Sequence, residues 1–147
     1  MLEKYKRQVV RKPEKLVVEG EAGAGKTTFA CSSHTKKEPV FVINADDGGE
    51  NVFHKTGIDL IHDCVPTGDL KENAEIWDKL MATLRELASE KTGIKRIIID
   101  SMDRIEILAQ AKTCVLHKQD NIESFGYGKG FSYALGETLK LLSGLNY

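Results

Sequence analysis

The chain has 147 residues, enough to bury the core of one domain, and its formal net charge of −1 gives no overall field that attracts nucleic acid or an anionic membrane. No apolar stretch approaches the ~20 residues of a membrane span, and the charged start over residues 1–6 lacks the apolar core of a secretory signal. The three cysteines are scattered without metal-binding spacing, which favours reduced thiols in a cytoplasmic protein.

The first third of the chain predicts a strand, a loop and a helix. Residues 1–14 are an irregular basic lead-in, and residues 16–18 form an apolar run that stops near glycine, as a buried parallel strand does. A glycine-rich loop follows over residues 20–25, and a short helix is expected from Thr27 to about Ser33. We therefore place the start of the folded domain at residue 15.

Two more strands and a long helix are expected next. Residues 40–43 are β-branched and aromatic and end in a polar cluster, and a weaker strand is indicated over residues 58–65. Asp69 followed by Glu72 predicts a capping box. Behind it, apolar residues at helical spacing predict an amphipathic helix over residues 70–89, with Trp77 packed into the core.

The last third predicts one more strand and two helices. Residues 97–99 form a third apolar strand that ends at Asp100. A helix over about residues 105–116, a loop over residues 125–130 and a final helix from Phe131 follow. Strands that alternate with helices predict an α/β fold, in which helices flank a mostly parallel sheet, as one domain over residues 15–147.

The glycine-rich loop predicts a phosphate-binding site. It satisfies every fixed position of the pattern GxxxxGK followed by Ser or Thr, and the residues expected to contact nucleotide are Gly20, Glu21, Ala22, Gly23, Ala24, Gly25, Lys26, Thr27 and Thr28. Glycines let backbone N–H groups converge on a phosphate, and the following helix adds its positive end. Lys26 is expected to reach the β- and γ-phosphates, and the Thr27 hydroxyl to coordinate Mg²⁺.

A carboxylate at the end of the third strand is the expected partner of this loop. Mg²⁺ held by a hydroxyl and phosphates needs an acidic residue nearby, and α/β sheets bind ligands at the C-terminal ends of their strands. Asp100 occupies such an end, so Thr27 and Asp100 are the predicted metal ligands, and Lys26 and Asp100 are predicted to act in catalysis.

The nucleotide predicted from the motifs is ATP. Residues 117–120 differ from the guanine-reading NKxD pattern at the first position, and no glycine stands three residues after Asp100, as the γ-phosphate switch of GTPases requires. Glu21 also stands where the ParA/MinD type carries an extra lysine. Ser101 is not the glutamate of DExx enzymes, so the water-activating carboxylate must come from elsewhere, with Asp46, Asp47 and Glu50 as candidates.

The chain resembles the phage-encoded RecA-like ATPases of the Sak type, a family of phage nucleotide-binding proteins. The resemblance covers roughly residue 15 to the end and rests on the loop at residues 20–28, the strand and Ser101 at residues 97–101, and the glycine-rich segment at residues 126–131. It implies Mg·ATP binding and hydrolysis coupled to single-stranded DNA in phage recombination or annealing, in the bacterial host cytoplasm. It also implies a recombination or annealing partner, and homo-oligomers are compatible with it.

Two residue roles follow from this resemblance. Asp46 falls where RecA-like proteins end their second strand in a catalytic glutamate, which makes it the first choice for the water-activating carboxylate. Residues 126–130 correspond in place to a DNA-binding loop of RecA, so Tyr127 is expected to stack on a base and Lys129 to contact a phosphate. The alternative is a flexible connection in which Tyr127 packs inward.

The resemblance also implies a strand that this chain does not supply. In RecA-type folds a strand with a γ-phosphate sensor lies between the phosphate-loop strand and the strand that ends at Asp100, and here residues 145–147 stand where it would begin. A sheet without it would have a gap of about 9.5 Å, with unpaired backbone groups on both sides. We therefore expect a C-terminally truncated part of a longer protein, or a sheet completed by other means.

Two other functions use the same loop. A small-molecule kinase would pass the γ-phosphate to an acceptor, but such enzymes cover the phosphate with an arginine-bearing lid, and Arg85, Arg96 and Arg104 do not lie in a lid-like segment. An ATP-binding switch module would bind nucleotide with negligible turnover.

Overall fold

The computed structural model describes residues 14–145, so the predicted lead-in at residues 1–13 and the last two residues lie outside the described part. The elements in chain order are α1 (Lys26–Cys31), β1 (Val40–Asn44), α2 (Glu50–Thr56), β2 (Ile61–Asp63), α3 (Leu70–Ser89), β3 (Arg96–Asp100), α4 (Met102–Leu116), the 3-10 helix η2 (Ile122–Phe125) and α5 (Lys129–Gly144). No helix within residues 14–145 is long and apolar enough to cross a membrane.

The sheet consists of parallel strands in the order β2-β1-β3. Asn44 is level with Asp63 on one side and with Asp100 on the other, so the strands end together at one edge. The second predicted strand and the strand ending at Asp100 are confirmed, and the weaker one is confirmed over a shorter stretch. The predicted α/β fold with helices around a parallel sheet is therefore confirmed.

The predicted strand at residues 16–18 is wrong. This segment pairs with no strand in the described part of the chain, and Leu16 and Val17 are 75% and 79% exposed. A strand needs a neighbour for its backbone N–H and C=O groups. Within residues 14–145, β3 pairs only with β1, so no strand lies at its other edge to receive this apolar run.

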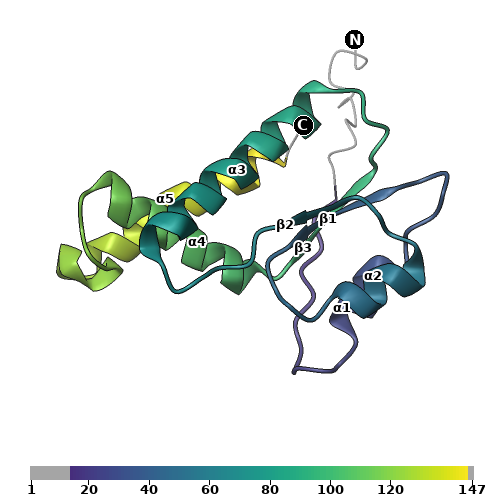
Figure 1. Cartoon of the computed structure of the whole chain (residues 1–147), viewed down its shortest axis with the longest axis horizontal. Coiled ribbons are helices and arrows are strands. Elements are labelled where there is room, and N and C mark those ends of the chain that lie inside the picture. The colour runs from purple at the N-terminus through teal and green to yellow at the C-terminus, as the bar shows by residue number, and fades with distance from the viewer. Residues whose placement is uncertain (1–13, 146–147) are drawn as a thin grey trace, which may run out of the picture.

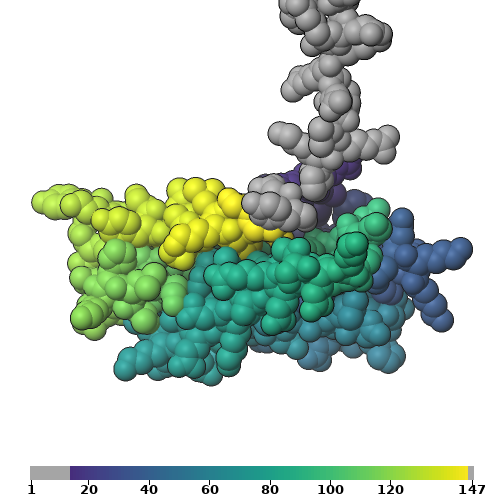
Figure 2. Space-filling view, turned by 90° about the horizontal axis from the view of Figure 1, so that it is seen from above, coloured from purple at the N-terminus to yellow at the C-terminus, as the bar shows by residue number. Residues whose placement is uncertain are grey.

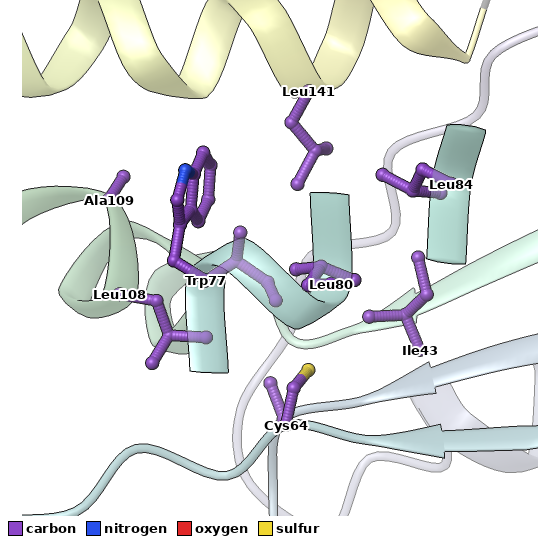
Figure 3. Close-up of a cluster of buried hydrophobic side chains, with 10 residues drawn as sticks. Ile43, Cys64, Trp77, Leu80, Leu84, Leu108, Ala109 and Leu141 are labelled. Atoms are coloured by element: carbon purple, nitrogen blue, oxygen red, sulfur yellow. The ribbon is translucent and has the colours of Figure 1, made fainter. Parts of the chain in front are cut away.

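Helices cover both faces of the sheet. Figure 1 shows α1 and α2 on one side and α3, α4 and α5 on the other. On the larger side, Trp77 and Leu80 of α3 lie between the α5 residue Leu141 and two residues at the sheet, Ile43 of β1 and Cys64, which directly follows β2 (Figure 3). On the smaller side, Val42 packs with Phe53 and other apolar residues of α2 and the strands. These two cores hold the C-terminal edge of the sheet in place.

The long helix begins and ends as its sequence predicts. The Asp69 carboxylate accepts a hydrogen bond from the Glu72 backbone N–H at 2.8 Å, which is half of a capping box. The Glu72 side chain instead accepts from the Thr67 hydroxyl at 2.9 Å. Trp77 is only 2% exposed, so its predicted place in the core is confirmed.

The glycine-rich segment before α5 is shorter than predicted, because Lys129 and Gly130 already belong to the helix. Gly130 is buried against η2, where a Cβ atom would lie 2.2 Å from the Ile122 carbonyl oxygen. Glycine at position 130 therefore allows α5 to pack closely against η2, and it does not make the segment flexible. Figure 2 shows α5, in yellow, alongside α3, and the yellow-green segment that leads into α5 at one end of the molecule.

Candidate nucleotide-binding site

The loop before α1 has the backbone shape that its glycines permit. Gly23 and Gly25 have φ angles of 78° and 85°, in the left-handed region that side chains disfavour. A turn closes the loop, in which the Ala24 N–H donates to the Glu21 carbonyl oxygen at 3.2 Å. Residues 20–25 are exposed, so their backbone groups are open to a ligand.

Lys26 folds back over the start of this loop. Its ammonium donates hydrogen bonds to the carbonyl oxygens of Gly20 at 2.7 Å and Glu21 at 2.8 Å. Both acceptors are neutral, and no carboxylate within residues 14–145 forms an ion pair with this cation. A phosphate would offer it charge-assisted hydrogen bonds, which are roughly twice as strong as neutral ones.

The sheet and the loop meet through Thr27 and Asp100. The Thr27 hydroxyl donates to a carboxylate oxygen of Asp100 at 2.5 Å, although 73 positions separate them in the chain. Both residues are partly buried. A hydroxyl and a carboxylate oxygen are the hard ligands that Mg²⁺ prefers, and this ion takes its other ligands from phosphates and water. The residues present therefore fit Mg²⁺ bound together with a nucleotide.

A row of polar side chains continues from Asp100 along the sheet edge. Asp63, Asn44 and Asp100 are level on adjacent strands, so their side chains emerge on the same face, which is the face that α1 covers. The Asn44 Nδ2 group donates to Asp63 Oδ1 at 2.7 Å. Asn44 and Asp63 also line a cavity of about 290 Å³ beside α2.

The Asn44 side chain leaves one polar atom without a partner. Asn44 is 4% exposed, and its Oδ1 atom is buried without a hydrogen bond from any residue in the described part of the chain. Its orientation is determined by Asp63, because an ionised carboxylate accepts hydrogen bonds and cannot donate one to the amide oxygen. A buried acceptor without a donor costs about 1–3 kcal/mol, which marks this atom as one that needs a ligand or water.

A cysteine beside the site is held in its neutral form. Burial raises the pKa of the Cys31 thiol, and the nearby negative charge of Asp100 raises it further. The three cysteines are free and buried, as the prediction of reduced thiols expects. A neutral, buried thiol is a poor nucleophile, so Cys31 contributes packing here rather than chemistry.

Asp46 lies near this edge without a partner in the site. It follows β1 by two positions and is exposed, and its carboxylate accepts a hydrogen bond from the adjacent Asp47 N–H at 2.9 Å. In the described residues no hydrogen bond joins it to the loop or to Asp100. The structure thus brings Lys26, Thr27 and Asp100 together and leaves Asp46 at the solvent side of the same edge.

The predicted DNA-contacting residues lie away from the loop. Tyr127 is fully exposed and adopts a positive φ of 49° between two glycines that also have positive φ, so it does not pack inward. Lys129 is exposed at the start of α5. Figure 1 places the segment before α5 at the far end of the helical layer from the loop before α1. These two residues therefore form no single site with Lys26.

An aromatic cluster holds the base of this segment. The His117 ring stacks on Tyr133 with centroids 4.8 Å apart, and Phe125 contacts both rings edge-on at 5.4 and 5.7 Å. These contacts join the end of α4 to α5 at the base of the exposed turn over residues 126–128. Tyr127 is thus presented on an anchored turn.

The fold and the site together define a P-loop nucleoside-triphosphate-binding domain, because a glycine-rich loop, its lysine and threonine, and the carboxylate of a parallel strand meet at one sheet edge. Residues 12–146 match the AAA domain family, and the chain belongs to that family. The finding confirms the predicted P-loop class.

A more distant similarity points to the same class. The chain is 28% identical over 114 residues to GPN-loop GTPase 1 of Schizosaccharomyces pombe, a match that covers 66% of this chain and 31% of that protein. The chain thus spans less than a third of this curated relative. No solved structure matches the chain significantly.

Sequence reasoning assigned no role to Asn44 and Asp63. The available signal was a polar residue at the end of each apolar strand, which places both side chains at the ligand-binding edge. The sequence does not predict that Asn44 lies level with Asp63, because no sequence signal marks where the weaker strand within residues 58–65 ends.

Proposed function

We propose that the chain binds Mg·ATP at residues 20–28. Lys26 leaves the carbonyl oxygens that it contacts and binds the β- and γ-phosphates, and Thr27 and Asp100 hold Mg²⁺. The observation that carries this proposal is the Thr27–Asp100 hydrogen bond, which joins the two predicted metal ligands across 73 positions. Bound Mg²⁺ would supply neutralisation of phosphate charge.

ATP rather than GTP remains the proposed nucleotide. The relative from Schizosaccharomyces pombe is named a GTPase, but the match covers 31% of it. The chain carries neither the guanine-reading NKxD pattern nor a glycine three residues after Asp100. Both nucleotides therefore belong in the test.

Hydrolysis is the proposed reaction, with Asp46 as the residue that activates water. Support comes from its place after β1, at the edge where Asp100 ends β3. Its carboxylate binds only the adjacent Asp47 N–H among the hydrogen bonds of residues 14–145, so it is free to reorient when nucleotide binds. Asp47 and Glu50 are the alternatives on the same connection.

Single-stranded DNA is the proposed partner of the segment at residues 126–129. The exposed ring of Tyr127 would stack on a base and the adjacent Lys129 would contact a phosphate. Support comes from the aromatic cluster below, which holds the turn in an exposed position. The resemblance to Sak-type proteins supports a role in phage recombination or annealing, with a recombination protein or further copies of the chain as partners.

Measurement of phosphate release from ATP and GTP, with and without single-stranded DNA, tests this function. Phosphate release from ATP that rises with DNA supports it, while ADP formation that requires a small-molecule acceptor and releases no phosphate supports a kinase. Tight binding without phosphate release supports a nucleotide-dependent switch. Equal turnover of GTP would contradict the proposed preference for ATP.

A further inference from the structure

The buried amide of Asn44 has a role that the loop, Lys26 and Asp100 do not account for. It stands between two carboxylates in the row Asp63, Asn44, Asp100, and its nitrogen is bound to Asp63. The oxygen and nitrogen of an amide diverge from one carbon atom, so Oδ1 does not face Asp63. It is left without a donor on the strand next to Asp100.

Asn44 is held rigidly in this place. Its backbone carbonyl oxygen accepts a hydrogen bond from the Cys64 N–H at 2.8 Å, and the following residue, Ala45, donates to the Asp100 carbonyl oxygen at 2.7 Å. The side chain is anchored by Asp63 as well. A rigid acceptor without a donor is arranged for a group that arrives with a ligand.

The chain contains a second buried asparagine that shows the contrast. Asn73 is 5% exposed, and both ends of its amide are bound: Oδ1 accepts from the Thr67 N–H at 2.7 Å, and Nδ2 donates to the Thr67 carbonyl oxygen at 3.0 Å. Asn73 closes the turn before α3 and has a structural role. Asn44, equally buried, does not complete its hydrogen bonds within residues 14–145.

We propose that Asn44 is a ligand-contacting residue of the nucleotide site, whose Oδ1 accepts a hydrogen bond from a water molecule held beside Asp100 when Mg·nucleotide is bound. Asp63 is a positioning residue that keeps the amide oxygen turned toward this water. The inference rests on the proposed binding of Mg·nucleotide at Thr27 and Asp100. Water is the donor that Mg²⁺ sites offer, because Mg²⁺ usually keeps several waters when it binds with a nucleotide.

The test measures the affinity of a fluorescent ATP analogue with and without Mg²⁺, so that the ratio of the two dissociation constants reports the gain that Mg²⁺ gives. Asn44→Leu should lower this ratio about 3- to 10-fold, the value of one lost hydrogen bond, and leave the Mg²⁺-free affinity within about twofold. Its melting temperature without nucleotide should equal or exceed that of the wild type, because an unpaired buried acceptor is removed.

Asn73→Leu is the matched control. It removes a fully bonded buried amide, so its melting temperature should fall while the Mg²⁺ ratio stays at the wild-type value. Asp63 is exposed, so its variants test the same idea with little risk to folding. Asp63→Ala should lower the ratio at least about twofold, and Asp63→Glu, which still offers Nδ2 a carboxylate that cannot donate to Oδ1, should lower it less.

Three results would overturn the inference. If Asn44→Leu keeps the wild-type ratio, Asn44 contacts no water of the bound complex. If Asn73→Leu lowers the ratio as much as Asn44→Leu, the effect is structural. If the wild type binds no Mg·nucleotide, the proposed function fails together with this inference, whereas normal wild-type binding with an unchanged Asn44→Leu ratio refutes the inference alone.

Discussion

Asp100 has one observed contact and one proposed task at the end of β3. Its carboxylate accepts the hydrogen bond of Thr27, which ties the start of α1 to the sheet, and we propose that it also holds Mg²⁺. The contact and the task can be separated, because an amide oxygen accepts a hydroxyl proton as a carboxylate does but binds Mg²⁺ more weakly.

Asp100→Asn should therefore keep the fold and the contact with nucleotide but weaken the dependence of binding on Mg²⁺. Titration of nucleotide binding with Mg²⁺ measures this, and the midpoint should move to a higher Mg²⁺ concentration. Asp103→Asn, an exposed carboxylate in the first turn of α4, is the control. An unchanged midpoint for Asp100→Asn would remove Asp100 from the metal site.

Cys64 gives the folded chain a pH dependence at alkaline pH. Burial raises the pKa of this thiol to about 12, and the adjacent charge of Asp63 adds to the shift. The unfolded thiol loses its proton from its ordinary pKa of 9.0, while the folded one keeps it. The unfolded state then binds fewer protons, so stability is fully present below about pH 9 and is lost as the pH rises toward 12.

Urea unfolding of the wild type and Cys64→Ala between pH 8 and pH 11 checks this prediction. The free energy of unfolding of the wild type should fall more steeply above about pH 9 than that of Cys64→Ala, whatever the difference between them at pH 8. Parallel curves for the two proteins would show that the Cys64 thiol is not protected from ionisation.

At the scale of elements, α3 begins with an N-cap residue, Asp69, that the sequence predicts. The Asp69 carboxylate satisfies the Glu72 N–H at the start of a 20-residue helix whose Trp77 and Leu80 fill the larger core. Asp69→Ala should lower the free energy of unfolding by about 1 kcal/mol. Glu75→Ala, on the exposed side of the same helix, should change it by less than about 0.5 kcal/mol. If denaturant unfolding shows the same loss of unfolding free energy for both variants, the Asp69 cap does not stabilise α3 more than an exposed helix residue does.

The exposed turn before α5 is the element proposed to bind DNA. Lys129→Ala should weaken binding of single-stranded DNA and flatten its salt dependence by about one counterion, while Tyr127→Ala should weaken binding with little change in the salt slope. Fluorescence anisotropy at several salt concentrations measures both. A loss of ATP turnover in Lys129→Ala without DNA would instead assign Lys129 to a nucleotide site shared between copies of the chain.

At the scale of the whole molecule, one sheet joins two unequal cores. The larger core places α3, α4 and α5 on one face, and the smaller core places α1 and α2 on the other. The loop and Asp100 meet at the edge between these layers, and the exposed turn before α5 lies at the far end of the larger one (Figure 1). Helix α4 begins directly after Asp100 and contacts η2, so it connects the proposed nucleotide site with the turn proposed to bind DNA.

The predictable parts of this molecule are those that depend on local pattern. The capped helix at residues 70–89 and the loop at residues 20–27 carry their own signals, a cap with a 3.6-residue period and a spaced glycine motif. The prediction of a strand at residues 16–18 is wrong because an apolar run by itself does not indicate whether a neighbouring strand is present to pair with it. The unpaired oxygen of Asn44 depends on strand register, which no local pattern records.

The central claim is that Lys26 serves a bound nucleoside triphosphate, and titration of Lys26→Ala with a fluorescent ATP analogue in Mg²⁺ tests it most directly. Loss of a charge-assisted contact should weaken binding at least about tenfold relative to the wild type. Lys55→Ala, an exposed lysine on α2, should bind as the wild type does. If Lys26→Ala binds the analogue as tightly as the wild type, the assignment of the nucleotide to this loop is contradicted.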